Sequence, residues 1–334
     1  MAALSDTRPT YLDWAKRRDP DGGMATIMEI MSKATPIVDD MVVLEANGPL
    51  HHRTTVRSGL PSGTWRKLNY GVPVEKGKTK QVNDVIGSLE TYAEVDKMIA
   101  DLNGNTAEWR MSEERGFMEG LAQTIATAVI EGNTDTDPEK FMGFAPRYNS
   151  LGADNGRMIV QGTGSSGADT NSSIWGIVWD SNASHGLFPK GMSGSAGLKV
   201  QDLGQETLLD GNTPTGYYEG YRTHYQWMAG LSVRDWRKAC RVHTNVADVV
   251  TGTVNILDLM ADAYNNLHMP NSGKLCWYTT REMKTILDIE AMNKTNMALA
   301  QQQQDNGGPV TTFWGAPVKH LETMVTWTEA RIPA

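Results

Sequence analysis

Residues 105–132 read NTAEWRMSEERGFMEGLAQTIATAVIEG, and this pattern predicts one long helix. Every fourth residue from Phe117 to Val129 is apolar, which places a single apolar stripe along a helix. Asn105 is a candidate N-cap, and Gly132 can supply a left-handed C-terminal cap. We therefore expect a helix over residues 105–131, about 39 Å long at 1.5 Å per residue, that forms the backbone of a flat domain.

Charges of opposite sign gather on the two sides of residue 81. Between residues 53 and 80 the sequence holds seven basic residues and a single acidic one, Glu75. Between residues 84 and 119 it holds nine acidic and three basic residues. The basic group consists of Arg53, Arg57, Arg66, Lys67, Lys76, Lys78 and Lys80. The acidic residues within the first half of the predicted helix are Glu108, Glu113, Glu114 and Glu119.

Two explanations fit this charge pattern. In the first, the basic segment lies across the acidic helix of an identical neighbour, because complementary potentials select and steer partners. In the second, the charges balance within one chain on a solvated surface. Carboxylates near a helix N-terminus also complement the helix dipole, which gives part of the acidity a purely local cause.

Residues 51–96 are expected to form an extended hairpin. Thr54–Arg57, Thr64–Leu68 and Gln81–Val95 are rich in residues that favour strands, and residues 71–80 supply a Gly/Pro/Lys tip. With few apolar residues at its tip, such a hairpin cannot build a core of its own. It must lie either on its own domain or on another subunit.

Composition excludes several classes of protein. The chain has 334 residues, of which 40% are hydrophobic and 21% charged, as in globular proteins. Its formal net charge of −8 argues against a main role in gripping nucleic acid. The only two cysteines, Cys240 and Cys276, support neither a disulfide framework nor a zinc knuckle. No stretch approaches 18 apolar residues, so we expect a soluble protein from a reducing compartment, with no membrane partner.

Outside these two stretches, the periodicity predicts short helices and strands. Residues 1–50 resemble an arm, with helical pieces at Thr10–Lys16 and Met24–Met31. Within the Gly- and Ser-rich region at 141–212 we expect only short strands. The other predicted elements are strands at Met158–Val160 and Ile174–Trp179, a ribbon over Tyr221–Val242 that Gly230 interrupts, a helix over Ile256–Leu267, a strand over Lys274–Tyr278, a helix that begins near Thr279, a polar loop over Gln301–Gly308, and strands over Thr311–Val318 and Leu321–Trp327.

No group of residues predicts catalysis, a cofactor or a metal. The seven histidines are scattered and form no HExxH or HxH arrangement. The loop Gly162–Gly167 lacks the Lys-Ser/Thr ending of a phosphate-binding loop, and Ser193–Ser195 lacks the spacing of a nucleophile elbow. Both are better explained as turns. A Gly-rich hydrolase that acts through Ser195 or a histidine stays open as an alternative.

Several stretches, taken in order along the chain, resemble one known family. They are Tyr11–Lys16, Tyr92–Lys97, Leu102–Asn105, Arg222–Trp227, Val233–Arg237 and Phe313–Val318. Singly these motifs are weak, but in this order they are specific. The sequence resembles the major capsid proteins of tailed double-stranded DNA phages, which have the Hong Kong 97-type fold, and most closely those of short-tailed phages.

The resemblance implies an α+β chain with four parts. These are an N-terminal arm at residues 1–50, an E-loop hairpin at 51–96, a P-domain at 97–245 with the spine helix and a Gly-rich β region, and an A-domain at 246–334 that can return to the P-domain. In many relatives the long paired P-domain strands follow the turn that matches Phe313–Val318, and here 16 residues remain after it. We therefore expect the ribbon at Tyr221–Val242 to take their place in a rearranged strand order.

The resemblance also implies a structural rather than an enzymatic function. The chain would self-assemble as hexamers and pentamers into an icosahedral shell around packaged double-stranded DNA, and would reside in the virion after assembly in the host cytoplasm. Because the chain starts directly at the arm, a separate scaffolding protein is expected, beside a portal and a cement or decoration protein. Contacts of the arm would come from Tyr11, Trp14, Lys16, Arg17 and Arg18. An encapsulin-type compartment that encloses cargo enzymes is the alternative.

Covalent links between subunits are not expected. Some relatives join an E-loop lysine to an asparagine of a neighbour with the help of a buried glutamate. Lys76, Lys78 and Lys80 are candidate amines, but we identify no matching asparagine–glutamate pair. Boiled particles should therefore give one band at the mass of a single chain.

Overall fold

The computed structural model describes residues 35–102, 106–162, 170–192, 196–209, 216–292, 299–303, 309–324 and 329–333. Both helical pieces expected in the arm lie outside these ranges, and so do the arm residues Tyr11, Trp14, Lys16, Arg17 and Arg18 and the candidate nucleophile Ser195. None of the helices in the described ranges is long and apolar enough to span a membrane.

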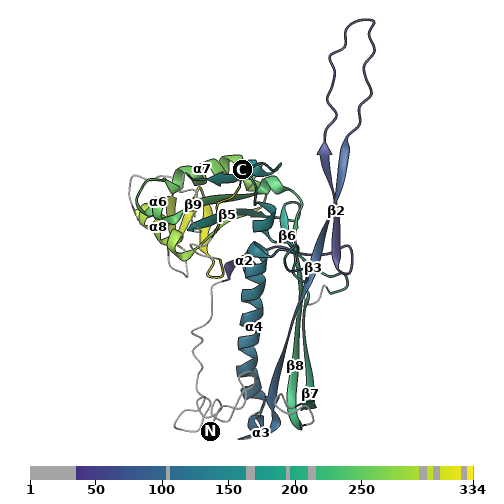
Figure 1. Ribbon diagram of the computed structural model, residues 1–334, viewed down its shortest axis with the longest axis vertical. Helices are drawn as coiled ribbons and strands as arrows, with labels where there is room; N and C mark the ends of the chain where they lie inside the picture. Colours follow the sequence, from purple (N-terminus) through teal and green to yellow (C-terminus); the bar gives the residue numbers. More distant parts are fainter. Residues whose placement is uncertain are drawn as a thin grey trace.

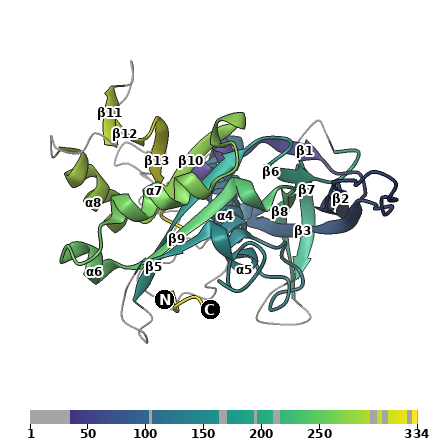
Figure 2. The same ribbon diagram turned by 90° about the horizontal axis from the view of Figure 1, so that it is seen from above.

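The described helices and strands form two regions that share one strand network (Figures 1 and 2). The helices are α2 (Pro36–Asp40), α3 (Lys97–Ala100), α4 (Thr106–Glu131), α5 (Phe144–Arg147), α6 (Val246–Val250), α7 (Ile256–Asn266) and α8 (Arg281–Met292). The strands are β1 (Val43–Glu45), β2 (His51–Gly59), β3 (Lys78–Asp96), β4 (Ile159–Gln161), β5 (Asn171–Trp179), β6 (Ser184–Phe188), β7 (Leu198–Leu209), β8 (Tyr217–Val233), β9 (Ala239–Asn245), β10 (Lys274–Thr279), β11 (Leu299–Gln303), β12 (Pro309–Phe313) and β13 (Ala316–His320).

The first region is a long antiparallel sheet beside α4. Strand β8 pairs with β3 from Gly230/Ile86 to Gly220/Asp96 and with β7 along its other edge. Helix α4 runs beside these strands in Figure 1 and packs Leu121 against Ala93 of β3 and Tyr225 of β8. The apolar stripe of the sequence is therefore the face of α4 that covers the sheet. The helix begins at Thr106, one residue after its expected start, and ends at Glu131 as expected.

The second region is organised around β5, whose nine residues are all buried. Its side chains alternate between two apolar clusters, because strand side chains point to opposite faces of a sheet. Trp175, Ile177 and Trp179 join the cluster beneath α4 and α5, whereas Ile174 and Val178 join the one beneath α7 and α8. Strand β5 pairs antiparallel with β10 on one edge and β9 on the other. Helices on both faces explain why this strand is buried throughout, and why its second half, residues 174–179, is apolar without alternation.

A hairpin projects from the junction of the two regions (Figure 1). Strand β2 pairs with β3 from His51/Val85 to Gly59/Lys78, and residues 60–77 form no strand. The remainder of β3 leaves the hairpin and pairs with β8 instead. The hairpin expected over residues 51–96 is thus shorter than its prediction, because Ile86 to Asp96 belong to the sheet beside α4.

Several other expectations differ from the structure, and the first two concern the predicted ribbon. Gly230 does not interrupt the predicted ribbon, since β8 continues through it and passes there between Leu187 of β6 and Ile86 of β3. A Cβ atom at Gly230 would lie 3.1 Å from the carbonyl oxygen of Val85, so the glycine permits a close approach of strands. The second half of the ribbon, β9, pairs with β4 and β5 rather than with β8.

The remaining differences concern loops and strand ends. The Gly- and Ser-rich region contains the twelve-residue strand β7, which the sequence did not predict. Residues 301–303 belong to β11 rather than to a loop. Residues 321–324 form no strand, and the end of that predicted strand lies outside the described ranges. The domain division at residue 245 stays a prediction, although β5 and β10 pair across it.

Candidate intersubunit surfaces

The hairpin places its basic residues in solvent. All seven, from Arg53 to Lys80, are exposed. Within the ranges that the structure describes, none of the seven forms a salt bridge. Arg53 donates a hydrogen bond from Nε to Oδ1 of Asn83 (3.0 Å), and Arg66 donates one from Nε to the carbonyl oxygen of Tyr70 (3.1 Å). If these charges were balanced within one chain, carboxylates of that chain would pair with them. The described residues contain no such carboxylate partner.

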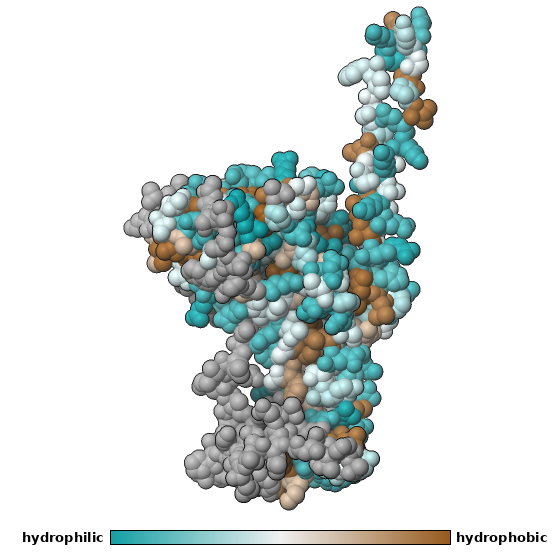
Figure 3. Space-filling view, viewed as in Figure 1, coloured by the Kyte–Doolittle hydropathy of each residue, from teal (hydrophilic) through white to brown (hydrophobic). Residues whose placement is uncertain are grey.

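The tip of the hairpin also exposes large apolar side chains. From the sequence, only a few apolar residues were expected there, and this expectation is wrong. Trp65 and Val74 are 100% exposed and Leu68 is 90% exposed. Leu60, Tyr70 and Val72 are exposed as well, and Figure 3 shows brown apolar groups along the projecting hairpin. A two-stranded ribbon offers no second layer against which such side chains can pack. Apolar groups gathered at one end of a protein mark an interaction site more often than apolar groups scattered singly.

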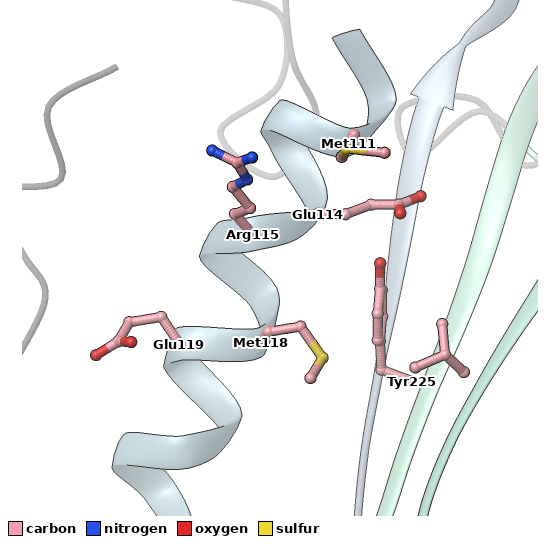
Figure 4. Close-up of a pocket in the computed structure, with 7 residues that line it drawn as sticks. Met111, Glu114, Arg115, Met118, Glu119 and Tyr225 are labelled. Atoms are coloured by element: carbon pink, nitrogen blue, oxygen red, sulfur yellow. The ribbon is translucent and has the colours of Figure 1, made fainter. Parts of the chain in front are cut away.

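The acidic residues predicted on the spine helix do not share one face. Glu114 points from α4 toward the sheet, whereas Glu119 and Arg115 point away from it (Figure 4). Glu114 accepts a hydrogen bond from Oγ1 of Thr223 (2.8 Å) and lies 3.7 Å from the guanidinium of Arg110. Glu119 accepts one from Nε2 of Gln123 (2.9 Å). Glu108 and Glu113 belong to α4, but their side chains lie outside the described part of the structure.

Arg110 connects the helix to the sheet. Its guanidinium lies 2.7 Å from the carboxylate of Asp202 on β7 and donates to Oγ1 of Thr223. The hydrogen bond from Arg110 lowers the pKa of Asp202 against the opposing effect of burial. Burial raises the pKa of Tyr225, and the nearby carboxylate of Glu114 raises it further. Glu114 therefore stabilises the contact between α4 and its own sheet. Glu119 differs from it, because its side chain points away from that sheet.

The opposite face of the sheet is charged but internally paired. Arg222 stacks its guanidinium 4.3 Å from the ring centre of Tyr92 and lies 3.3 Å from Glu94. His224 stacks on the same ring at 4.4 Å, and its Nε2 lies 3.2 Å from Glu90. Hydrogen bonds from Gln226 and, with a smaller effect, from Ser88 lower the pKa of Glu90. This cross-strand ladder contrasts with the hairpin, whose basic residues have no such carboxylate partners in the described part of the chain.

A cluster of ionisable groups lies where the hairpin joins the second region. Asp84 of β3 is buried and accepts a hydrogen bond from the guanidinium of Arg147 (2.8 Å). His185 of β6 is also buried, and its ring meets that of His52 on β2 edge to face at 5.9 Å. Burial, together with the charges of His52 and Arg234, lowers the pKa of His185 to about 4, although the charge of Asp84 opposes the shift.

Ser173, His243 and Glu329 lie together in the structure, but they do not have the geometry of a catalytic triad. The hydroxyl of Ser173 and the carboxylate of Glu329 both lie 3.1 Å from Nδ1 of His243. A triad needs the serine on one ring nitrogen and the carboxylate on the other. Nε2 of His243 is buried and has no hydrogen-bond partner among the residues that the structure describes. Glu329 also binds Arg241 at 2.8 Å, so this network anchors the C-terminal segment to β5 and β9.

The carboxylate of Glu329 stays charged in this network. Burial raises its pKa, but hydrogen bonds from His243 and Ser173 and the charge of Arg241 outweigh burial and lower it. No cluster of histidine, cysteine, aspartate and glutamate in the described ranges can hold a metal ion. The native cysteines Cys240 and Cys276 are buried free thiols. Among the described residues, the feature that most clearly suggests a function is the exposed hairpin.

Comparisons with known proteins agree with that outcome. The family model described as Major capsid protein GP7 matches residues 19–333. The capsid protein structure of bacteriophage Epsilon15 is 32% identical, with a TM-score of 0.76 and full coverage of both chains. The capsid of bacteriophage JBD30 has a TM-score of 0.50 at 8% identity, over 89% of this chain and 93% of that one, and this likeness shows the fold alone.

Two further comparisons give no second relative of comparable similarity. The encapsulin of Synechococcus elongatus PCC 7942 has a TM-score of 0.43 at 9% identity, over 66% of this chain and 91% of that one. At that score the likeness carries no argument for a cargo-enclosing compartment. A search of curated proteins gives no match. The chain thus belongs to the family of major capsid proteins described as GP7, with the α+β Hong Kong 97-type fold, and forms the icosahedral shell of a phage.

Proposed function

We propose that this capsid protein assembles as hexamers and pentamers, and that the basic hairpin of each subunit lies across α4 of its neighbour. The observation that carries the proposal is the set of seven exposed basic residues without a carboxylate partner among the described residues. They sit on a hairpin that has no core of its own, so another subunit is the surface that can neutralise them.

The energy of each such contact is small, and repetition makes it sufficient. An exposed ion pair contributes about 0.2–1 kcal/mol. Every subunit of a closed shell repeats the contact, so a small loss at one pair accumulates over the whole particle. Glu119, which faces away from its own sheet, is the described carboxylate of α4 best placed to receive the hairpin (Figure 4).

The proposal extends to the contents and partners of the shell. A net charge of −8 lets the wall confine double-stranded DNA without adhering to it, because like charges repel along the polymer. We propose a separate scaffolding protein, a portal and a cement or decoration protein as further partners, with assembly in the host cytoplasm and no catalytic activity. The relatives named above support the shell itself; these finer points rest on the family resemblance.

Charge reversal separates a contact between subunits from a contact within one. Changing Arg66, Lys67, Lys76 and Lys78 to glutamate should leave the melting temperature of the unassembled subunit unchanged and should abolish or weaken assembly in sedimentation. Adding Glu108→Lys and Glu119→Lys should restore part of it. Glu114 is kept, because its reversal would disturb Thr223 and Arg110 of the same chain. Higher salt should weaken assembly in the same direction.

A matched control reverses four exposed basic residues elsewhere, namely Lys190, Lys199, Arg281 and Arg331. This variant has the same net charge as the hairpin variant and should still assemble. The proposal is wrong if the hairpin variant melts many degrees lower, or if both variants fail to assemble to the same extent. The first outcome would place the charges within one subunit, and the second would reduce them to a general effect of net charge.

A further inference from the structure

The tip of the hairpin carries more than charge. Trp65 is fully exposed and Leu68 nearly so, and Arg66 and Lys67 stand between them. Tryptophan and arginine are the residues most enriched among those that dominate the energy of protein interfaces. A tryptophan held in water by a ribbon that cannot cover it gains much apolar contact when a partner surface encloses it. The tip therefore has the composition of an anchor.

One groove in the described residues suits such an anchor. It lies between α4, β3 and β8 and has a volume of about 580 Å³. Its apolar lining includes Ile125 of α4, Phe141, and Trp227 and Ala229 of β8. Two of these side chains are aromatic, and aromatic pairs gain energy beyond the area that they bury.

The rim of this groove is mainly acidic, whereas the tip of the hairpin is basic. Glu131, Asp137 and Glu139 lie around it with one basic residue, Lys140, which pairs with Asp137 at 2.9 Å. Arg66 and Lys67 of the tip are thus complementary to the rim while Trp65 is complementary to the apolar lining. The hairpin points away from α4 of its own chain (Figure 1), so the groove that receives the tip belongs to another copy.

We propose that Trp65 and Leu68 seat in this groove of a neighbouring subunit, with Arg66 and Lys67 against its acidic rim. This inference rests on the proposed function, in which the hairpin contacts a neighbouring subunit, and it specifies the site that binds the tip. The charges along the hairpin then guide the approach, and the apolar tip holds the contact once it has formed.

A second surface on α4 is the competing place for the tip. It is lined by Met111, Met118, Val200 and Tyr225 together with Glu114, Arg115 and Glu119 (Figure 4). Its carboxylate nearest the apolar lining, Glu114, already accepts a hydrogen bond from Thr223 of the same chain. Arg115 adds a positive charge that opposes Arg66 and Lys67. We therefore favour the groove beside Ile125, and the experiment distinguishes the two.

Substitution of Trp65 measures the strength of the anchor. Trp65→Ala should raise the subunit concentration required for assembly by about tenfold or more, as expected for an aromatic residue that anchors an interface. Trp65→Phe should recover most of the loss, because it restores an aromatic ring. Neither change should alter the melting temperature of the unassembled subunit. Unchanged assembly of Trp65→Ala would overturn the proposal.

Engineered disulfides locate the tip. The two native cysteines are buried and do not interfere. Leu68→Cys is combined either with Thr124→Cys, which lines the groove, or with Arg115→Cys on the competing surface, and assembled particles are oxidised. A ladder of covalent multimers on a denaturing gel is expected from the first pair and a single band from the second. A ladder from Arg115→Cys alone overturns the groove and leaves the contact with the neighbour in place, whereas single bands from both pairs overturn both proposals.

Discussion

Trp175 and Trp65 are the same residue in opposite surroundings. Trp175 lies in β5 with none of its surface exposed, and Trp65 lies at the hairpin tip with all of it exposed. Around Trp175 the rings of Phe144 and Tyr148 and the guanidinium of Arg241 complete a packed cluster. Around Trp65 the described residues supply no comparable layer. The second region thus uses its large side chains to fold one subunit, and the hairpin keeps its own for contacts between subunits.

The same contrast holds for charges. Asp40 is buried at the end of α2 and is held by Lys274 (2.6 Å), Lys319 (2.7 Å) and the hydroxyl of Tyr278 (2.8 Å). These contacts tie the segment that leads into β1 to β10 and β13. The seven basic residues of the hairpin have no such arrangement among the described residues. Substitutions in the two regions should therefore affect different measurements.

The largest difference is expected between the two tryptophans. Trp175→Ala removes a fully buried ring and should destabilise the subunit by about 3–5 kcal/mol, the usual cost for a large aromatic residue in a core. Trp65→Ala should leave the free energy of unfolding unchanged. Denaturant unfolding of the unassembled subunits checks both values. Equal losses in the two variants would remove the distinction between the regions.

The next effect is expected at Asp40. Asp40→Asn leaves two lysines without their buried carboxylate, and because both lysines reach solvent we expect about 1–3 kcal/mol, less than for a fully buried pair. Asp39→Asn, one residue away and exposed, is the matched control and should cost nothing measurable. If both variants unfold at the same denaturant concentration as the wild type, the contact does not secure this segment.

Asp40 also gives a pH dependence whose sign is fixed. Burial raises its pKa, but the hydrogen bonds from Lys274, Lys319 and Tyr278 outweigh burial and lower it. The carboxylate therefore contributes stability above the unfolded pKa of about 3.9, and this contribution disappears as the pH falls through the lower, folded value. Wild type and Asp40→Asn should differ most above pH 4 and converge in stronger acid.

A smaller effect is expected at the junction, from His185. Its folded pKa of about 4 lies below the unfolded value, so the unfolded chain takes up the proton first. Stability should fall as the pH drops from about 6.5 toward 4, by about 2 kcal/mol at pH 5. His185→Gln should remove this part of the slope, and melting temperatures between pH 7 and 4.5 measure it. Parallel pH profiles for wild type and variant would show that His185 does not cause the loss.

The sequence predicts those elements whose side-chain pattern follows from one local environment. Helix α4 has a single apolar stripe, and β5 is a short apolar run, so both were located within a few residues. Strand β7 reads LKVQDLGQETLL, and most of it is exposed, so no alternation identifies it. Gly230 looks like a break in isolation, whereas in the structure it lets β8 pass between two other strands.

The candidate surfaces were predicted only in part from the sequence. The basic residues of the hairpin could be read directly, because their exposure follows from a ribbon without a core. The role of Glu114 could not, since it depends on Thr223 and Arg110, of which Thr223 is distant in sequence. The apolar residues of the tip were visible in the sequence, but their number was underestimated. In the sequence, Trp65 and Leu68 flank Arg66 and Lys67, so the apolar and the basic residues occupy one short segment.

One measurement tests most directly whether the hairpin acts outside its own subunit. Residues 60–77 are replaced by an Asn-Gly turn that joins Gly59 to Lys78, and the melting temperature of the unassembled subunit is compared with that of the wild type. The two temperatures should agree within about 2 °C, which corresponds to a difference of at most about 1.4 kcal/mol for a chain of 334 residues at about 2.1 cal/mol/K per residue. A decrease of several degrees would show that the tip stabilises its own subunit and would contradict the account.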